Sequence, residues 1–183
     1  LYLGAGGAVT GSGVTISSAS VHGCSAGTSG GSLYLNYGGA VDTSALSVGL
    51  TVTTSSSAGS GNGGMIYYNA VGAVTSSVLT VSSPSVDTSS AGTSGGVMYV
   101  SYGSTVDGSG LTLSGLSVST SSTASGGSGG VLYYHCVGAV TGSALSVSSV
   151  TIASSSAGNG GGGSFEILYD SGSDSDLSFN SVS

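Results

Sequence analysis

Hydrophobic residues along this chain occur in short clusters in which apolar and polar side chains alternate. One such cluster is Leu-Tyr-Leu-Asn-Tyr at 33–37, and relatives of it follow at 66–70, 98–102 and 132–136. Alternation with a period of two is typical of β-strands, and the Gly/Ser-rich stretches between the clusters are typical of turns. No segment carries a helical period of useful length, so the pattern predicts an all-β protein.

The clusters belong to a tandem repeat. A Gly-Gly pair precedes each Tyr-containing cluster, and counting from it gives units 1–31, 32–64, 65–96, 97–130, 131–163 and 164–183. A second apolar cluster recurs at 46–48, 79–81, 111–113 and 145–147, and a third at 50–52, 116–118 and 150–152. Each unit therefore carries three candidate strands, followed by one long Gly/Ser stretch that we expect to be a loop.

Short strands at the same place in every unit bury their apolar faces only when the units stack. Each strand then pairs with its equivalent in the next unit, about 4.8 Å away. The sequence predicts one domain over 1–183, a parallel β-helix (β-solenoid) with about 33 residues per coil and five to six coils. The general crossover preference favours a right-handed coil, although the sequence alone leaves a left-handed one open.

The first strand of each unit shows a rhythm of two coils. Its two inward positions read Leu and Tyr at 35 and 37, Tyr and Ala at 68 and 70, Val and Tyr at 100 and 102, and Tyr and Cys at 134 and 136. Large and small residues that alternate between neighbouring coils fill a narrow core at normal density. Outside the core, Asp42 and Asp107 alternate with Thr10, Thr75 and Thr141. We therefore expect a super-repeat of two coils.

The two cysteines do not form a disulfide framework. Cys136 takes the place of Ala5 and Ala70 and is expected to be a small buried residue. Cys24 falls in a Gly/Ser stretch where other units have Ser55, Ser89, Ser121 and Ser155. The two are more than three coils apart, too far for an intrachain disulfide; an interchain bond through Cys24 stays open.

Composition excludes several classes of function. The 183 residues contain no Lys or Arg and seven acids, which gives a net charge of −7. Because no basic side chain can neutralise phosphate groups, we expect no nucleic-acid partner. A basic membrane-surface helix is excluded for the same reason. No apolar run approaches the roughly 20 residues of a membrane span, so we expect no membrane insertion. The Ser/Thr/Gly-rich surface predicts an extracellular or cell-surface location.

The titratable residues do not form a recognisable catalytic set. Asp42 and Asp107 stand about 9.6 Å apart on one face, but the two-coil repeat explains both, so we expect no enzymatic activity. His22 and His135 lack Cys, Asp or Glu at metal-ligand spacing. Asp170, Asp174 and Asp176, with Glu166 nearby, form an oxygen-rich stretch of the kind that Ca²⁺ prefers, but without the EF-hand pattern. We expect a solvated loop there, with Ca²⁺ as the alternative and no other cofactor.

The repeat resembles that of polymorphic outer membrane proteins and related β-helical surface proteins of the autotransporter-passenger type. The Gly-Gly pairs at 30–31, 63–64, 95–96, 129–130 and 162–163 match the Gly-Gly-Ala-Ile-type motif of that family, and the stretch 79–99 shows the likeness best. The family's Phe-x-x-Asn motif is represented only by pairs such as Val86 and Ser89. The resemblance implies a right-handed β-helix in a secreted or surface-displayed passenger, adhesin or filament component.

Two outward surfaces are candidates for interaction. The first is an aromatic ladder at one-coil spacing, made by Tyr2, Tyr34, Tyr67, Tyr99 and Tyr133. An exposed aromatic stripe indicates lateral packing or sugar stacking, unless its rings only stack on one another to stabilise the sheet. The second is a hydroxyl face in two columns, made by Thr15, Ser17, Thr80, Ser82, Thr112, Ser114, Ser146 and Ser148. It resembles the flat Thr faces of ice-binding solenoids, except that many positions are Ser.

Three functional hypotheses follow. The leading one is a structural or adhesive module of an extracellular fibre, sheath or surface protein. We expect it to continue head to tail, either covalently as a segment of a longer protein or fibre or between subunits that associate end to end or laterally, because an uncapped solenoid end is an open sheet edge. The alternatives are an ice-binding solenoid that uses the hydroxyl face, and a carbohydrate-binding module that uses the Tyr ladder with glycans as partners.

Overall fold

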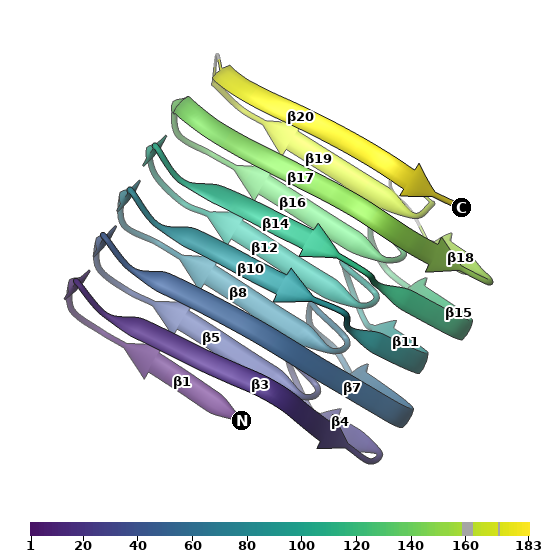
Figure 1. The fold of residues 1–183 in the computed structure, drawn as a ribbon. Coiled ribbons are helices and arrows are strands. Elements are labelled where there is room, and N and C mark those ends of the chain that lie inside the picture. Colours follow the sequence, from purple (N-terminus) through teal and green to yellow (C-terminus); the bar gives the residue numbers. More distant parts are fainter. Residues whose placement is uncertain (159–162, 172) are drawn as a thin grey trace.

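The alternating clusters fold as strands that pair in parallel, coil upon coil, in a computed structural model (Figure 1). It describes residues 1–158, 163–171 and 173–183, and these contain no helix. Figure 1 shows strands that run one way on the near side and the other way on the far side as the chain rises, which is a right-handed coil. The predicted β-solenoid is confirmed.

The Tyr-containing clusters form a six-stranded parallel sheet. Its strands, in spatial order, are β1 (Tyr2–Ala5), β5 (Leu33–Tyr37), β8 (Ile66–Ala70), β12 (Met98–Tyr102), β16 (Leu132–Cys136) and β19 (Phe165–Tyr169). Register partners such as Tyr2 and Tyr34, or Tyr99 and Tyr133, lie 32 to 34 residues apart, which confirms the predicted coil length.

The rest of each coil belongs to a second sheet of 14 strands that wraps around the core. Two-residue strands open the share of the first four coils: β2 (Val9–Thr10), β6 (Val41–Asp42), β9 (Val74–Thr75) and β13 (Val106–Asp107). The longer strands of the near side follow: β3 (Gly13–Val21), β7 (Ala45–Ala58), β10 (Val78–Ser82), β14 (Gly110–Ser114), β17 (Val140–Ile152) and β20 (Ser173–Val182). The Ser-rich strands complete it: β4 (Cys24–Ala26), β11 (Ser85–Ala91), β15 (Ser117–Ala124) and β18 (Ser155–Ala157).

The expectation of one long Gly/Ser loop per coil is wrong in part, because Ser-rich stretches such as 88–91 and 121–124 continue as strands. The reason is a column of buried serines. Ser56 and Ser89 are almost fully buried, and their hydroxyls donate to the carbonyl oxygens of Gly64 and Gly96 at 2.6 Å. A small polar side chain that forms a hydrogen bond with the backbone can line the interior of a sheet even though it is not apolar.

The two-coil rhythm of the core is confirmed by the register. One inward column contains Leu3, Leu35, Tyr68, Val100, Tyr134 and Ile167, and the other contains Ala5, Tyr37, Ala70, Tyr102, Cys136 and Tyr169. Because the large rings alternate between the two columns, each ring meets the next across the core rather than directly above itself. The ring centroids of Tyr68 and Tyr102 are 5.6 Å apart at 59°, and those of Tyr102 and Tyr134 are 5.7 Å apart at 63°. Tilted contacts of this kind are favourable for aromatic pairs.

The Gly-Gly pairs turn the chain into the Tyr-containing strand. In the pairs at 30–31, 63–64, 95–96 and 129–130 the first glycine adopts the left-handed conformation, with φ of 66° at Gly95. The second glycine of these four pairs has no room for a side chain, since a Cβ on Gly96 would lie 2.1 Å from the carbonyl oxygen of Gly130 in the next coil. The motif thus combines a tight corner with a close approach of neighbouring coils.

We expect Gly96→Ala to lower the free energy of unfolding by about 2 kcal/mol or more, because backbone must move in a close-packed corner. Gly7→Ala is the matched control, because a Cβ there would meet nothing within 4 Å. That control should change stability by less than about 0.5 kcal/mol. Urea denaturation followed by circular dichroism measures both, and equal stability of the two variants would contradict the packing described here.

Candidate interaction surfaces

The five tyrosines of the ladder form a continuous stack of nearly parallel rings. The centroids of Tyr34 and Tyr67 are 4.7 Å apart at 7°, and those of Tyr67 and Tyr99 are 5.2 Å apart at 2°. Tyr2 and Tyr133 extend the stack at its two ends, at 4.9 and 5.1 Å. The four later rings are half-buried, whereas Tyr2 is 68% exposed. In the sixth coil the column continues with Glu166, the register partner of Tyr133.

Stacking occupies the faces of the rings inside the ladder. Burial and the neighbouring hydroxyls of Tyr34 and Tyr99 raise the pKa of Tyr67, the middle ring of the ladder, to about 12. What the ladder presents outward is ring edges and hydroxyls, and only its two end rings, Tyr2 and Tyr133, have a face without a stacked ring. Sugar stacking needs open ring faces, and those inside the ladder are covered.

A polar column runs beside the ladder on the same sheet. It contains Gly4, Asn36, Asn69, Ser101, His135 and Leu168 by register. The Asn69 side-chain amide donates to Asn36 Oδ1 at 2.8 Å, so amides of successive coils are linked. This is a side-chain ladder that reinforces the sheet rather than a cluster of reactive groups.

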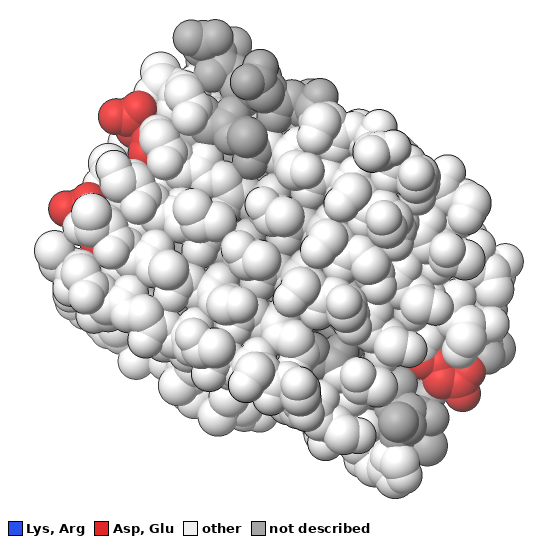
Figure 2. Space-filling model, in the orientation of Figure 1, with Lys and Arg blue, Asp and Glu red and all other residues white. Residues whose placement is uncertain are grey.

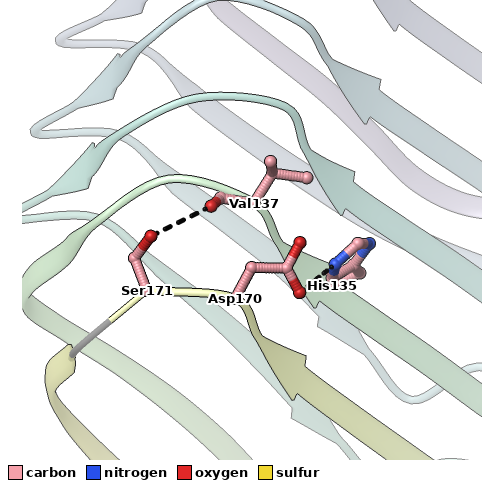
Figure 3. Close-up of polar contacts among 4 residues, drawn as sticks. All are labelled: His135, Val137, Asp170 and Ser171. Carbon is pink, nitrogen blue, oxygen red and sulfur yellow. Dashed lines mark hydrogen bonds and ion pairs between the residues drawn. The ribbon is translucent and has the colours of Figure 1, made fainter.

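His135 has a carboxylate partner that the sequence analysis missed. Its Nε2 lies 3.0 Å from Asp170 Oδ1, and Figure 3 shows the carboxylate pointing toward the ring, with Ser171 bonded to the carbonyl of Val137 beside it. The signal in the sequence was the spacing of 35 residues, about one coil. Within the described residues no group of three or more His, Cys, Asp or Glu could hold a metal ion.

The acidic stretch near the C-terminus is not a loop, which corrects the expectation for Asp174 and Asp176. Both belong to strand β20, where Asp174 pairs with Thr141 and Asp176 with Ala144 of β17. Pairing with the edge of β17 holds the polar segment of β20 in an extended conformation. The side chains of 173–177 lie outside the described residues, and so does the Ca²⁺ alternative at Asp170, Asp174 and Asp176.

Asp174 extends a column that alternates Thr with Asp through all six coils. The column is Thr10, Asp42, Thr75, Asp107, Thr141 and Asp174. Thr75 Oγ1 donates to Asp42 Oδ1 and Thr141 Oγ1 donates to Asp107 Oδ1, each at 2.7 Å. Each threonine thus bonds to the aspartate of the preceding coil. The place of Asp174 in this column could not be predicted from the sequence, because the acidic stretch is typical of a loop.

The residues of the hydroxyl face lie on the near-side strands. One column contains Thr15, Ser47, Thr80, Thr112, Ser146 and Ser178, and the other contains Ser82, Ser114, Ser148 and Asn180, with Ser17 at a bulge. A shallow hollow lies at Gly49, where the second column lacks a side chain. Figure 2 shows this face as almost wholly uncharged, with acidic side chains only near its margins.

Cys24 is not in a loop, and its column needs correction. It begins strand β4, and its equivalents are Ser56, Ser89, Ser122 and Ser155 rather than the expected Ser55 and Ser121. Both cysteines are free thiols, as expected for residues this far apart. Cys136 is fully buried, and this burial raises the pKa of its thiol to about 11 despite a hydrogen bond with Tyr134, which lowers it. Such a thiol is unreactive at neutral pH.

The fold and the surfaces define a tandem-repeat β-solenoid with a tyrosine-ordered core. Comparison with family models, curated proteins and solved structures gives no match for this chain. The resemblance to polymorphic outer membrane proteins is therefore supported at the level of the fold alone. The described part of the chain includes no helix that is long and apolar enough to cross a bilayer.

Proposed function

We propose that this chain is a structural module of an extracellular or cell-surface fibre, sheath or adhesive protein, and that it works by associating with itself. The observation that carries the proposal is the uninterrupted parallel repeat, in which each coil presents the same columns to the next. A further coil, whether it belongs to the same chain or to another copy, would pair in the same way. An aromatic stripe such as the stacked rings of Tyr34, Tyr67 and Tyr99 also favours association.

The regularity of the coil supports an architectural role. Successive coils repeat the same inward columns and the same corners, so a short sequence repeat is enough to specify a long, uninterrupted structure. In the part of the chain that the structure describes, the Thr–Asp hydrogen bonds recur every second coil and link neighbouring coils of the sheet, as expected for repeated structural contacts. We therefore propose a non-catalytic protein, without a cofactor, whose partner is another copy of itself.

The ice-binding and carbohydrate-binding alternatives have weaker support. The hydroxyl face is mostly serine, which lacks the methyl group of threonine, and Gly49 interrupts it. The ring faces of the Tyr ladder are covered by neighbouring rings, apart from one face each of the end rings Tyr2 and Tyr133. Thermal hysteresis or selective binding on a glycan array would revive the corresponding alternative.

Electron microscopy of the purified chain tests the leading proposal. We expect particles that lengthen in one dimension as the protein concentration rises, with a width equal to one or a few solenoids. Light scattering coupled to size exclusion should show the same growth in solution. Discrete monomers at all concentrations would contradict self-association.

A further inference from the structure

We infer that the Tyr ladder is a site of oxidative modification, at which tyrosines of successive coils are joined covalently as dityrosine. The ladder supplies one stacked ring per coil, at Tyr2, Tyr34, Tyr67, Tyr99 and Tyr133. The oxidant is hydrogen peroxide that acts through a peroxidase. The inference goes beyond the proposed function and does not depend on self-association, because the bond forms within one chain.

The spacing and orientation of the rings favour coupling between neighbours. Ring centroids along the ladder are 4.7 to 5.2 Å apart, and the ring planes are within 2° to 8° of parallel. Because the coils pair in register, each atom of one ring lies beside the same atom of the next ring. The carbons ortho to the hydroxyl, which carry much of the unpaired spin of a tyrosyl radical, are therefore neighbours along the whole ladder.

Coupling requires the rings to turn, and their position at the surface leaves room for this. Stacked rings meet face to face, whereas the new bond joins two ring edges. The rings of Tyr34, Tyr67, Tyr99 and Tyr133 are only half-buried. Partly exposed side chains change conformation rapidly, and the torsion about the Cβ–Cγ bond of tyrosine is soft. Rotation about this bond brings the ortho carbons of two neighbouring rings together.

The other five tyrosines of the chain provide an internal comparison. They lie in the core, where successive rings are tilted by 58° to 63°, and are Tyr37, Tyr68, Tyr102, Tyr134 and Tyr169. Tyr68, Tyr102 and Tyr134 are at most 4% exposed, so close packing holds these rings in place. Water also cannot accept the proton that a phenol loses on oxidation there. We expect the ladder to couple and the core to stay intact.

Few other side chains compete for the oxidant. The chain contains no Trp and two Met, and Met65 and Met98 are 0% and 1% exposed. Of the two thiols, that of Cys136 is buried and that of Cys24 is half-buried. The ladder is therefore the main accessible source of electrons. Because its rings are in contact, an electron can pass from ring to ring, so two radicals formed at different coils can become neighbours.

The reaction consumes one hydrogen peroxide per cross-link. Each of two tyrosines gives up one electron and its phenolic proton and becomes a neutral radical. The radicals pair to form a carbon–carbon bond between two ortho carbons, and the hydrogen on each of these carbons moves to the oxygen of its ring, which restores both phenols. The peroxide takes up the two electrons and two protons, its O–O bond breaks, and two water molecules leave.

Such bonds would tie each coil to the next on the outer face of the sheet. Each closes a loop of 32 to 34 residues, the separation of the register partners. Closing a loop restricts the unfolded chain and so stabilises the folded one. We therefore expect the cross-linked protein to unfold at a higher urea concentration than the untreated protein.

Treatment of the folded chain with peroxidase and hydrogen peroxide tests the inference, at low protein concentration and in a Cys24→Ser background. We expect the blue fluorescence of dityrosine and a monomer whose mass falls by two hydrogen atoms per cross-link. Cleavage before aspartate divides the ladder among the peptides 1–41, 42–86, 87–106 and 107–169. Linked pairs of consecutive peptides should then appear in the mass spectrum.

Two variants of strand β8 distinguish the ladder from the core. Tyr67→Phe keeps the stacked ring but has no phenol to oxidise, so it should remove the links of peptide 42–86 to both of its neighbours. Tyr68→Phe is the matched control, because it removes a core phenol from the same strand and should leave both links unchanged. Circular dichroism checks that both variants fold.

The other outcomes would overturn the inference. Equal loss of the links in the two variants would show that the ladder is not the site. Covalent dimers as the main product would place the bond between copies rather than between coils. Absence of dityrosine under conditions that couple the free amino acid would show that the stacked rings cannot turn to meet.

Discussion

Moving one tyrosine to the neighbouring core column should leave this protein with little or no native structure. The double variant Val100→Tyr with Tyr102→Ala keeps one tyrosine in β12 but reverses its phase. The ring at 100 would then stand directly between Tyr68 and Tyr134, its register partners. The other column would carry three small residues in a row. Removing a buried aromatic costs about 3–5 kcal/mol, and overpacking costs about 1–3 kcal/mol more. These losses are comparable with the total stability of a domain, about 5–15 kcal/mol.

The control for this variant is Tyr102→Phe, which keeps the ring in its column and should cost less than about 1.5 kcal/mol. Far-ultraviolet circular dichroism and urea denaturation separate the two cases. If the free energy of unfolding of the reversed-phase variant lies within about 1 kcal/mol of the wild-type value, the alternation of large rings between columns is not what packs the core. The comparison isolates phase, since both positions are fully buried in the native protein.

The core of this fold could be predicted from the sequence because the residues that stack in it recur at a regular spacing along the chain. The alternation in each Tyr-containing cluster defines which side chains point inward, and the repeat defines what stacks on them. The alternation of Tyr68 and Tyr102 between columns could therefore be predicted without coordinates. The Gly-Gly corners were also visible, but the reason for the second glycine, a clash with the next coil's backbone, appears only in three dimensions.

The Ser-rich segments were harder to predict for two physical reasons. Serine has little strand preference of its own, so only burial against the next coil shows that Ser56 and Ser89 line the interior. A register shift between Val86 and Thr88 also moves the pairing by one residue. Counting along the chain therefore aligned Cys24 with Ser55, whereas the structure pairs it with Ser56. A bulge of this kind leaves no signature in the repeat.

Contacts between different parts of neighbouring coils were missed for a related reason. His135 and Asp170 are not register partners, since His135 faces Leu168 in β19, and the carboxylate reaches back from the following turn. Repeat spacing predicts which residues stack but not which turns bend toward a neighbour. The strand at 173–182 was missed because its acidic sequence indicates a loop by itself, and pairing with β17 overrides that local preference.

Alkaline pH should unfold this protein steeply, because its core is held by tyrosines that must stay protonated. Burial is the main cause that raises the pKa values of Tyr68, Tyr102 and Tyr134 well above 10, their value in the unfolded chain. Above pH 10 the unfolded state releases these protons and the folded state keeps them. Stability therefore falls as pH rises, by about 1.4 kcal/mol per pH unit for each such ring. Three rings together remove about 4 kcal/mol per unit, so we expect unfolding within roughly two units of pH 10.

Tyrosinate absorbance and circular dichroism recorded on the same samples test this expectation, since the core rings should ionise only as ellipticity is lost. The Tyr102→Phe variant removes one buried ionisable hydroxyl while it keeps the ring, so its unfolding midpoint should move to higher pH. Tyr2→Phe is the matched control at the exposed end of the ladder, and its midpoint should not move. Complete ionisation of the tyrosines near pH 10 with full ellipticity would contradict this expectation, because it would mean that water reaches the core rings of the folded protein. The tightly packed columns of alternating rings leave no room for that water.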